Sequence, residues 1–368
     1  MHIPYKVGLS MKHKLLFSLC SLLLATSAQA EVNISGFASV VAGRVIDGTG
    51  VAEFDLGPTF LADYPLVGAY DEDISFKPDT LFGIQFSADL LEGLSATAQV
   101  VSRGADDFSA DFEWAYLSYE LNEHWTVQGG KKRLPLYYYS DFFDVGYAYP
   151  WIRPPADNYT WQVFNYTGVS ALYNYLMGEW TMSGQVYYGS EDSDPNKLLS
   201  DFFFLENTRE VWKDIGGIVV QFNRDWLDIR LTHMQYTNER YIGGVQQEWN
   251  GNKQRTGKFY GLSVNIDYNN FLFLSELNRL DLDGSNLDTY LVTLGYRIKS
   301  VMPYVSYSDF NDGEGGEVHH TTSAGIRWDF HPSAAFKIQY DDVKDEGGPG
   351  MKVAGDSQSI SLGVDLVF

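Results

Sequence analysis

The chain has little cysteine, few basic residues and no long apolar run in its main part. Its 368 residues include one Cys, which excludes an internal disulfide and a Cys-based zinc site. Lys and Arg total 26 against 48 Asp and Glu, a net charge of −22, so the basic footprint of a nucleic-acid binder is missing. With 12 Pro and 45% hydrophobic residues, it is not a disordered acidic tail either. The 25 Tyr and 35 Gly fit a barrel of many strands as well as two soluble domains.

Residues 1–30 have the three-part pattern of a secretory signal peptide. Met11 is an alternative first residue, and a short basic segment follows it. After this segment come the apolar run 15–24 and the small-x-small cleavage site 28–30. Ten apolar residues are too few to span a bilayer, which takes about 20 in a helix. We expect cleavage after Ala30. The remaining 31–368 then has no Cys and a charge of −25, from 23 basic and 48 acidic residues.

The rest of the chain alternates apolar and polar residues in segments of about ten. The alternation is clear in 82–90, 260–268 and 322–330, and a period of two indicates β-strands. A soluble sandwich would also alternate. However, aromatic residues gather at the ends of the apolar faces, and very short turns alternate with long loops, as in membrane barrels. The sequence therefore predicts an all-β, transmembrane antiparallel β-barrel of about 16 strands, including 74–90 and 161–175, with short periplasmic turns and long extracellular loops.

The last predicted strand is the most specific element. Apolar residues alternate from Ile360 to the terminal Phe368. Here the sequence resembles the Gram-negative outer-membrane general porins, in particular those of marine gamma-proteobacteria. The resemblance implies an integral outer-membrane protein in contact with lipids and lipopolysaccharide, and a homotrimer. It also implies that Phe368, Leu366 and Val364 form a signal for the barrel-assembly machinery.

In porins the loop after the fifth strand folds inward and narrows the pore. The matching segment here is 134–160, which carries four of the 12 Pro and many aromatic residues. We expect an inward constriction loop. An outward loop packed by its own aromatics and an aromatic surface for stacking sugar rings are the alternatives. The candidate constriction residues are Asp141, Asp144, Asp157, Tyr139 and Tyr147.

Basic residues on the polar faces of the strands are expected to line the pore wall opposite this loop. At least one residue of the cluster 131–133 must point inward, because neighbours in a strand alternate. Inward acids nearly balance these bases, so the excess negative charge should lie in outer loops such as 47–73, which has seven acids and no base. An acidic entrance concentrates cations. The candidate wall residues are Arg103, Lys131, Lys132, Arg133, Arg230, Arg297, Arg327 and Lys337.

No motif points to a metal, a cofactor or an enzyme. His319 and His320 are adjacent in a predicted strand and point to opposite faces, and a Gly-x-Ser-x-Gly elbow is absent. The leading hypothesis is a porin for passive diffusion of small hydrophilic solutes, weakly selective for cations. A substrate-specific porin for saccharides or another nutrient, and a closed barrel that acts as a receptor or adhesin, are the alternatives.

Overall fold

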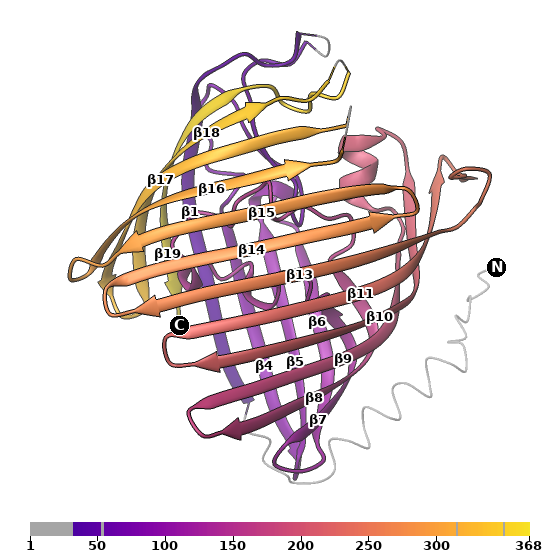
Figure 1. The fold of residues 1–368 in the computed structure, drawn as a ribbon, viewed down its shortest axis with the longest axis vertical. Coiled ribbons are helices and arrows are strands. Elements are labelled where there is room, and N and C mark those ends of the chain that lie inside the picture. The colour runs from indigo at the N-terminus through magenta and orange to yellow at the C-terminus, as the bar shows by residue number, and fades with distance from the viewer. Residues whose placement is uncertain (1–31, 53–54, 314–315, 349) are drawn as a thin grey trace, which may run out of the picture.

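The computed structural model describes residues 32–368 except 53–54, 314–315 and 349, so the predicted signal peptide and Glu53 lie outside the described residues. Sixteen long strands form one closed antiparallel barrel (Figure 1), which confirms the predicted fold class. The strands are β1 (Val32–Gly48), β4 (Leu81–Leu91), β5 (Leu94–Arg103), β6 (Ala110–Glu120), β7 (Trp125–Arg133), β8 (Asn165–Met177), β9 (Trp180–Ser193), β10 (Thr208–Arg224), β11 (Leu227–Ile242), β13 (Arg255–Tyr268), β14 (Phe271–Leu282), β15 (Ser285–Tyr296), β16 (Val301–Asn311), β17 (Val318–His331), β18 (Ala334–Asp345) and β19 (Ser357–Val367).

The remaining elements are short and belong to the loops. In the part of the chain that the structure describes, no helix is long and apolar enough to cross a membrane. The short elements are β2 (Phe60–Ala62), β3 (Gly68–Tyr70), β12 (Val245–Gln246), η2 (Gly104–Asp106), η3 (Ser140–Phe142), η4 (Gly146–Ala148) and η5 (Leu199–Phe203).

The first strand closes the barrel by pairing on both sides. Residues 32–39 of β1 pair with β4, and residues 37–48 pair with β19. Closure leaves no free sheet edge, so ladder partners supply the backbone hydrogen bonds. The terminal Phe368 continues this closure, because its N–H and C=O bond Gly36 at 3.0 and 2.8 Å and its ring stacks on Phe82.

Most predicted strands agree with the observed ones to within a few residues, and 74–90 differs most. The strand β4 begins at Leu81, and Ser75 makes only an isolated bridge to Gly43. Pro78 lies between them, and a proline cannot donate to a ladder. The chain before β4 therefore belongs to the first loop.

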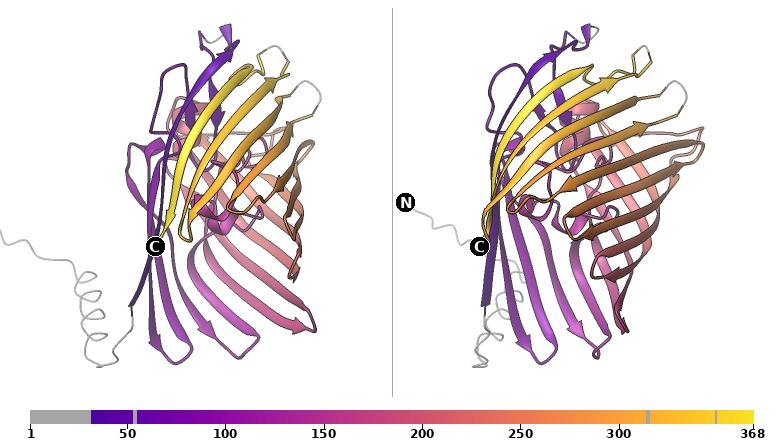
Figure 2. Two further views of the ribbon diagram at one scale, coloured as in Figure 1. Left: turned by 90° about the vertical axis from the view of Figure 1, so that its left-hand side faces the viewer. Right: turned by 60° about the vertical axis from the view of Figure 1, so that its left-hand side comes forward.

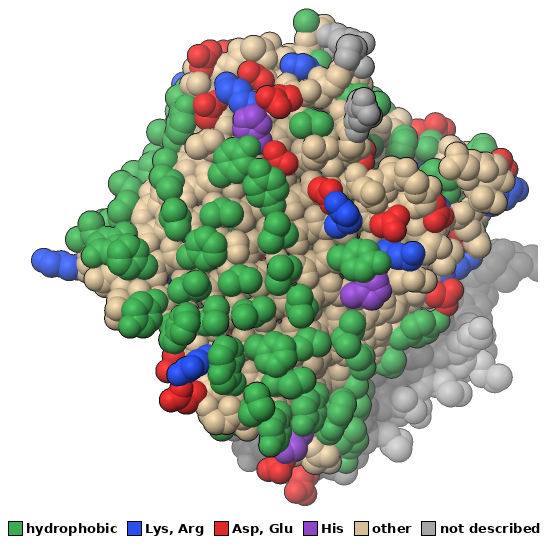
Figure 3. Space-filling view, in the orientation of Figure 1, with side chains coloured by type: hydrophobic (Ala, Val, Ile, Leu, Met, Phe, Trp, Pro, Cys, Tyr) green, Lys and Arg blue, Asp and Glu red, His purple; other side chains and the backbone are tan. Residues whose placement is uncertain are grey.

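The outer face of the barrel is apolar. In β15, Tyr290, Val292 and Leu294 are exposed, while Leu291 and Thr293 between them are buried. Figure 3 shows a broad apolar band across the strands, with charged side chains gathered toward its two ends. This distribution suits a hydrocarbon slab with water on both sides.

The buried apolar core lies inside the barrel and combines loop residues with inward residues of the strands. We call residues 134–164 between β7 and β8 the inner loop, and 49–80 between β1 and β4 the first loop. Figure 2 shows the inner loop within the barrel rather than above its mouth. Trp151 is completely buried, and Tyr64 of the first loop packs on Phe143 at 4.8 Å between ring centroids. Thus part of the first loop, which the sequence places in an outer acidic region, also enters the barrel mouth.

Candidate functional site

Aromatic side chains give the inner loop a core of its own. Tyr139 lies at its centre, with ring centroids 5.5 Å from Trp151, 5.7 Å from Tyr149 and 5.3 Å from Phe142. These edge-on contacts are the favoured arrangement of aromatic pairs. The loop is therefore a packed unit that can hold a defined shape within a wide barrel.

Basic residues of the wall hold the backbone of the inner loop. Lys337 of β18 donates to the carbonyls of Gly146 and Trp151 at 2.6 and 2.5 Å. Arg327 of β17 donates to two further loop carbonyls at 2.8 Å, and Arg230 of β11 to that of Pro135 at 2.8 Å. A buried irregular segment has carbonyls without ladder partners, and these donors satisfy them. Three of the predicted pore-wall bases thus anchor the loop.

A buried ionic network fixes the start of the inner loop. Asp144 accepts hydrogen bonds from Arg103 at 2.7 and 3.0 Å and from Arg133 at 2.8 Å. Glu113 of β6 binds the same two guanidinium groups at 2.5 and 2.7 Å. All four residues are nearly inaccessible to solvent. Asp144, a predicted constriction residue, therefore lies in the anchor of the loop and not at its water-exposed edge.

Asp157 anchors the other end of the loop. Its carboxylate accepts a hydrogen bond from Ser308 at 2.5 Å and contacts His319 Nδ1 at 2.5 Å. The other nitrogen of His319 contacts Glu317 at 3.1 Å. Because both ring nitrogens face carboxylates, the geometry suits a protonated imidazolium.

Further wall residues that bind the loop were missed by the sequence analysis. Glu276 of β14 accepts hydrogen bonds from the Tyr138 N–H and the Tyr159 hydroxyl at 3.1 and 3.0 Å. Gln339 of β18 accepts one from the Ile152 N–H at 2.8 Å. Alternation places both on the inner face, but it carries no information on which inward residues touch a loop.

The inner loop leans on one half of the barrel. Inward residues of β13 to β19 such as Ser263, Ser306 and Ser361 are buried beneath it. The opposite wall keeps a row of polar, partly exposed inward side chains. An aqueous passage can therefore run along this second wall, which is formed by β4 to β10. Its partly exposed residues include Gln85, Ser87, Thr97, Ser118, Gln128 and Gln185.

Asp141 lies on the edge of the loop that faces this passage. It is exposed, and its carboxylate is within electrostatic range of Tyr116, Lys132 and Tyr166 on the opposite wall. Lys132 also contacts Gln128 on the inner face. An acid on the loop and a lysine on the wall therefore face each other across the passage.

The remaining candidates take varied positions. In the strand ladder Lys131 lies opposite Ala115 and Thr167, which are exposed on the outer face. Lys131 therefore lies on the outer face and not on the pore wall, where the sequence predicts it. Arg297 lies near the turns and pairs with Asp267 at 2.5 and 2.6 Å. The Tyr147 hydroxyl donates a hydrogen bond to the carbonyl of Pro332 at 2.8 Å. Val364, Leu366 and Phe368 lie on the outer face of the closing strand, where Leu366 and Phe368 are exposed.

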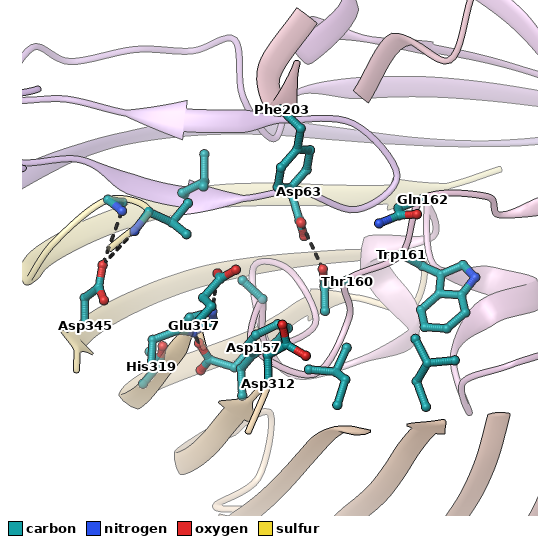
Figure 4. Close-up of a pocket in the computed structure, with 18 of the residues that line it drawn as sticks. Asp63, Asp157, Thr160, Trp161, Gln162, Phe203, Asp312, Glu317, His319 and Asp345 are labelled. Atoms are coloured by element: carbon teal, nitrogen blue, oxygen red, sulfur yellow. Dashed lines mark hydrogen bonds and ion pairs between the residues drawn. The ribbon is translucent and has the colours of Figure 1, made fainter. Parts of the chain in front are cut away.

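A cavity of about 290 Å³ lies above the inner loop (Figure 4), and we call it the loop-side cavity. Trp161 and Trp212 form part of its wall. Asp63 of the first loop accepts a hydrogen bond from Thr160 at 2.8 Å, and burial raises the pKa of Asp63 to about 7. The charged lining residues are Asp63, Asp157, Asp312, Glu317 and Asp345 against Arg255 and His319.

A second cavity, of about 430 Å³, lies below the inner loop, and we call it the turn-side cavity. Its roof includes Tyr138, Phe142 and Tyr147. Its wall comes from the turn ends of β10 to β17 and includes Asp228 and Asn265. The described residues that line it are all different from those that line the loop-side cavity.

No family model matches the sequence, and no curated protein matches it. Solved structures match its fold at low identity. The outer membrane channel DcaP of Acinetobacter baumannii is 11% identical, with a TM-score of 0.59 over 93% of this chain and 99% of that one. An anion-selective porin from Comamonas acidovorans is 13% identical, with a TM-score of 0.57 over 92% and 100%. A trimer form of OmpT of Vibrio cholerae is 11% identical, with a TM-score of 0.54 over 92% and 99%. The chain thus has the fold of these outer-membrane barrels.

Proposed function

We propose that this protein is an outer-membrane porin through which small hydrophilic solutes diffuse passively, with a weak preference for cations. The observation that carries the proposal is the uneven placement of the inner loop. The loop side of β13 to β19 has buried inward residues such as Ser263, Ser306 and Ser361, whereas inward residues of β4 to β9 such as Gln85, Ser118 and Gln185 are partly exposed to solvent. A barrel of 16 strands is wide enough for such an aqueous channel. We propose no enzymatic activity for this protein. We also propose that it is similar to the general porins of marine gamma-proteobacteria.

The charges at the entrance support the preference for cations. In the loop-side cavity five carboxylates accompany one arginine and one histidine. Asp47, Asp55, Asp71, Glu72 and Asp73 add exposed negative charge around the mouth. Negative potential at a channel entrance raises the local concentration of cations and lowers that of anions. A porin of similar fold is described as anion-selective, so the proposed preference rests on the charges of this chain and not on its fold.

We also propose that the protein is a homotrimer in contact with lipids and lipopolysaccharide, and that the barrel-assembly machinery inserts it into the outer membrane. The outer wall of β4 to β7 supports the trimer, because it has a shallow hollow lined by small residues. Such a surface allows close approach of another barrel. A structure of similar fold is described as a trimer form. The small residues in the hollow are Ala88, Ala96, Ala98, Ala115 and Gly129.

Conductance in a planar bilayer tests the proposal. We expect stepwise currents that grow linearly with salt concentration, and a reversal potential in a KCl gradient with the sign of cation preference. Absence of conductance from folded, purified protein would instead favour the closed receptor or adhesin. A reversal potential of the opposite sign would contradict the cation preference and leave the channel in place.

A further inference from the structure

Two buried polar atoms of the turn-side cavity have no partner within the described protein. Asp228 Oδ2 accepts hydrogen bonds from Gln221 and Asn223 at 2.6 and 3.0 Å, whereas Asp228 Oδ1 accepts none from the described residues. Asn265 Oδ1 accepts one from the Ser275 N–H at 3.1 Å, whereas Asn265 Nδ2 donates none there. Both side chains are 92% buried, since each is 8% exposed. An unpaired buried polar atom is costly, so this acceptor and this donor suit a ligand that supplies both.

The two arginines of this cavity are already paired. Arg297 binds Asp267 with both terminal nitrogens, and Arg327 binds Asp329 at 2.8 Å as well as two carbonyls of the inner loop. An anionic ligand would have to compete with these carboxylates for the arginines. A neutral ligand with hydroxyl groups can use Asp228 and Asn265 without breaking either ion pair.

The roof of the cavity offers flat apolar surfaces. Tyr138, Phe142 and Tyr147 line it from the inner loop, and Leu272 and Leu274 line it from β14. The side chains of Tyr138, Phe142 and Tyr147 are partly exposed. A pyranose ring has the matching structure, with C–H groups that pack on aromatic faces and hydroxyls around its edge that donate and accept. The volume of about 430 Å³ is in the range of small-molecule sites, about 300–1,000 Å³.

We infer that the turn-side cavity binds a neutral saccharide, with Asp228 and Asn265 on its hydroxyls and Tyr138 and Phe142 against its ring. This inference rests on the proposed porin function, because a sugar crossing the lumen would reach the cavity after passing the inner loop. The site makes the channel selective among neutral solutes, a property that the acidic entrance does not provide.

Maltose added to single channels in a planar bilayer tests the inference. We expect brief, concentration-dependent blockades in the millimolar range, and none with sodium gluconate at equal viscosity. Titration calorimetry of the detergent-solubilised full protein with maltose gives a measure of binding that does not depend on conduction. Blockade by both compounds, or by neither, would overturn the inference.

Two variants and a control locate the site. Asp228→Asn keeps the shape but turns an acceptor into a donor, and Tyr138→Ser removes an aromatic surface. Each should weaken maltose binding about ten-fold, whereas Asp288→Asn, in an exposed ion pair with Arg279, should bind as the unmodified protein does. The heat-dependent electrophoretic mobility of each variant shows whether it is folded. If Asp228→Asn does not fold, Tyr138→Ser alone tests the site.

The outcomes separate this inference from the porin proposal. Normal ion currents without maltose binding would overturn the saccharide site and leave the porin. Maltose binding that Asp228→Asn weakens, in a protein that conducts no ions, would support the site and overturn the porin. Maltose binding that neither variant weakens would overturn the assignment of the site to this cavity.

Discussion

The ammonium of Lys337 donates to the carbonyl of Trp151 at 2.5 Å across 186 positions of the chain. Both residues are completely buried, one on a barrel strand and one in the inner loop. Lys337 also pairs with Asp365 of β19 at 2.8 Å. One wall residue therefore connects the loop to two neighbouring strands.

Replacing Lys337 by Met should loosen the inner loop. The change removes two donors to loop carbonyls and leaves the Asp365 carboxylate buried without its cation, which costs about 3 kcal/mol or more. We expect a lower unfolding temperature in detergent and noisier single-channel currents. Lys344→Met is the control, because Lys344 lies on the same strand but pairs with Asp342 and Asp356 at a partly exposed site. Equal behaviour of the two variants would contradict the anchoring role.

Asp141→Asn and Asp144→Asn should separate selectivity from stability. A unit charge about 8 Å from an ion in water contributes about 0.5 kcal/mol, so loss of the exposed Asp141 charge should lower the cation-to-anion permeability ratio about two-fold. Asp144→Asn should instead destabilise the barrel, because Arg103 and Arg133 lose a buried carboxylate. Reversal potentials and thermal unfolding measure the two effects. A selectivity change only in the Asp144 variant would reverse our assignment.

Cation preference should increase as the pH rises through 7. Burial raises the pKa of Asp63 from 3.8 to about 7, so this carboxyl is neutral at pH 5 and charged at pH 8.5. The same shift means that stability from Asp63 is present below about pH 4 and is lost between about pH 4 and 7, because the folded state holds the proton more tightly. Reversal potentials at pH 5 and 8.5 should differ less in Asp63→Asn than in Asp71→Asn, which changes an exposed acid of the same loop.

Ala98→Trp should disrupt a trimer. Ala98 lines the hollow on the outer wall of β4 to β7, and a large side chain there prevents close approach of a second barrel. Size-exclusion chromatography with light scattering in mild detergent should show a shift from trimer toward monomer. Val305→Trp on β16 is the control, because Val305 is 55% exposed on the outer face away from the hollow. A trimer that survives Ala98→Trp would exclude this wall as the contact.

The sequence by itself determined the barrel. A period of two in segments such as 82–90 and 322–330 requires one apolar and one polar face, and this pattern is local, so it can be recognised without knowing any partner. It also indicated an inward position for Arg230, Arg327 and Lys337, but not which residues of 131–133 point inward. The start of β4 was harder to predict. Pro78 interrupts the backbone hydrogen bonding between strands, whereas the prediction was based on the pattern of apolar residues.

The tertiary structure alone decided how the inner loop and the wall meet. The loop carries Asp141 and Asp144 only three positions apart, yet one faces the lumen and the other is buried between two arginines. Alternation places Lys131 and Lys132 on opposite faces of β7, but only the structure shows that Lys132 is the one that faces inward. The burial of Asp144 depends on contacts with Arg103 and Arg133, 41 and 11 positions away, and the loop is held by contacts such as that of Lys337 with Trp151, 186 positions apart. Local periodicity carries no information on such contacts, so the anchoring network and the two cavities emerge only when the barrel closes around its loop.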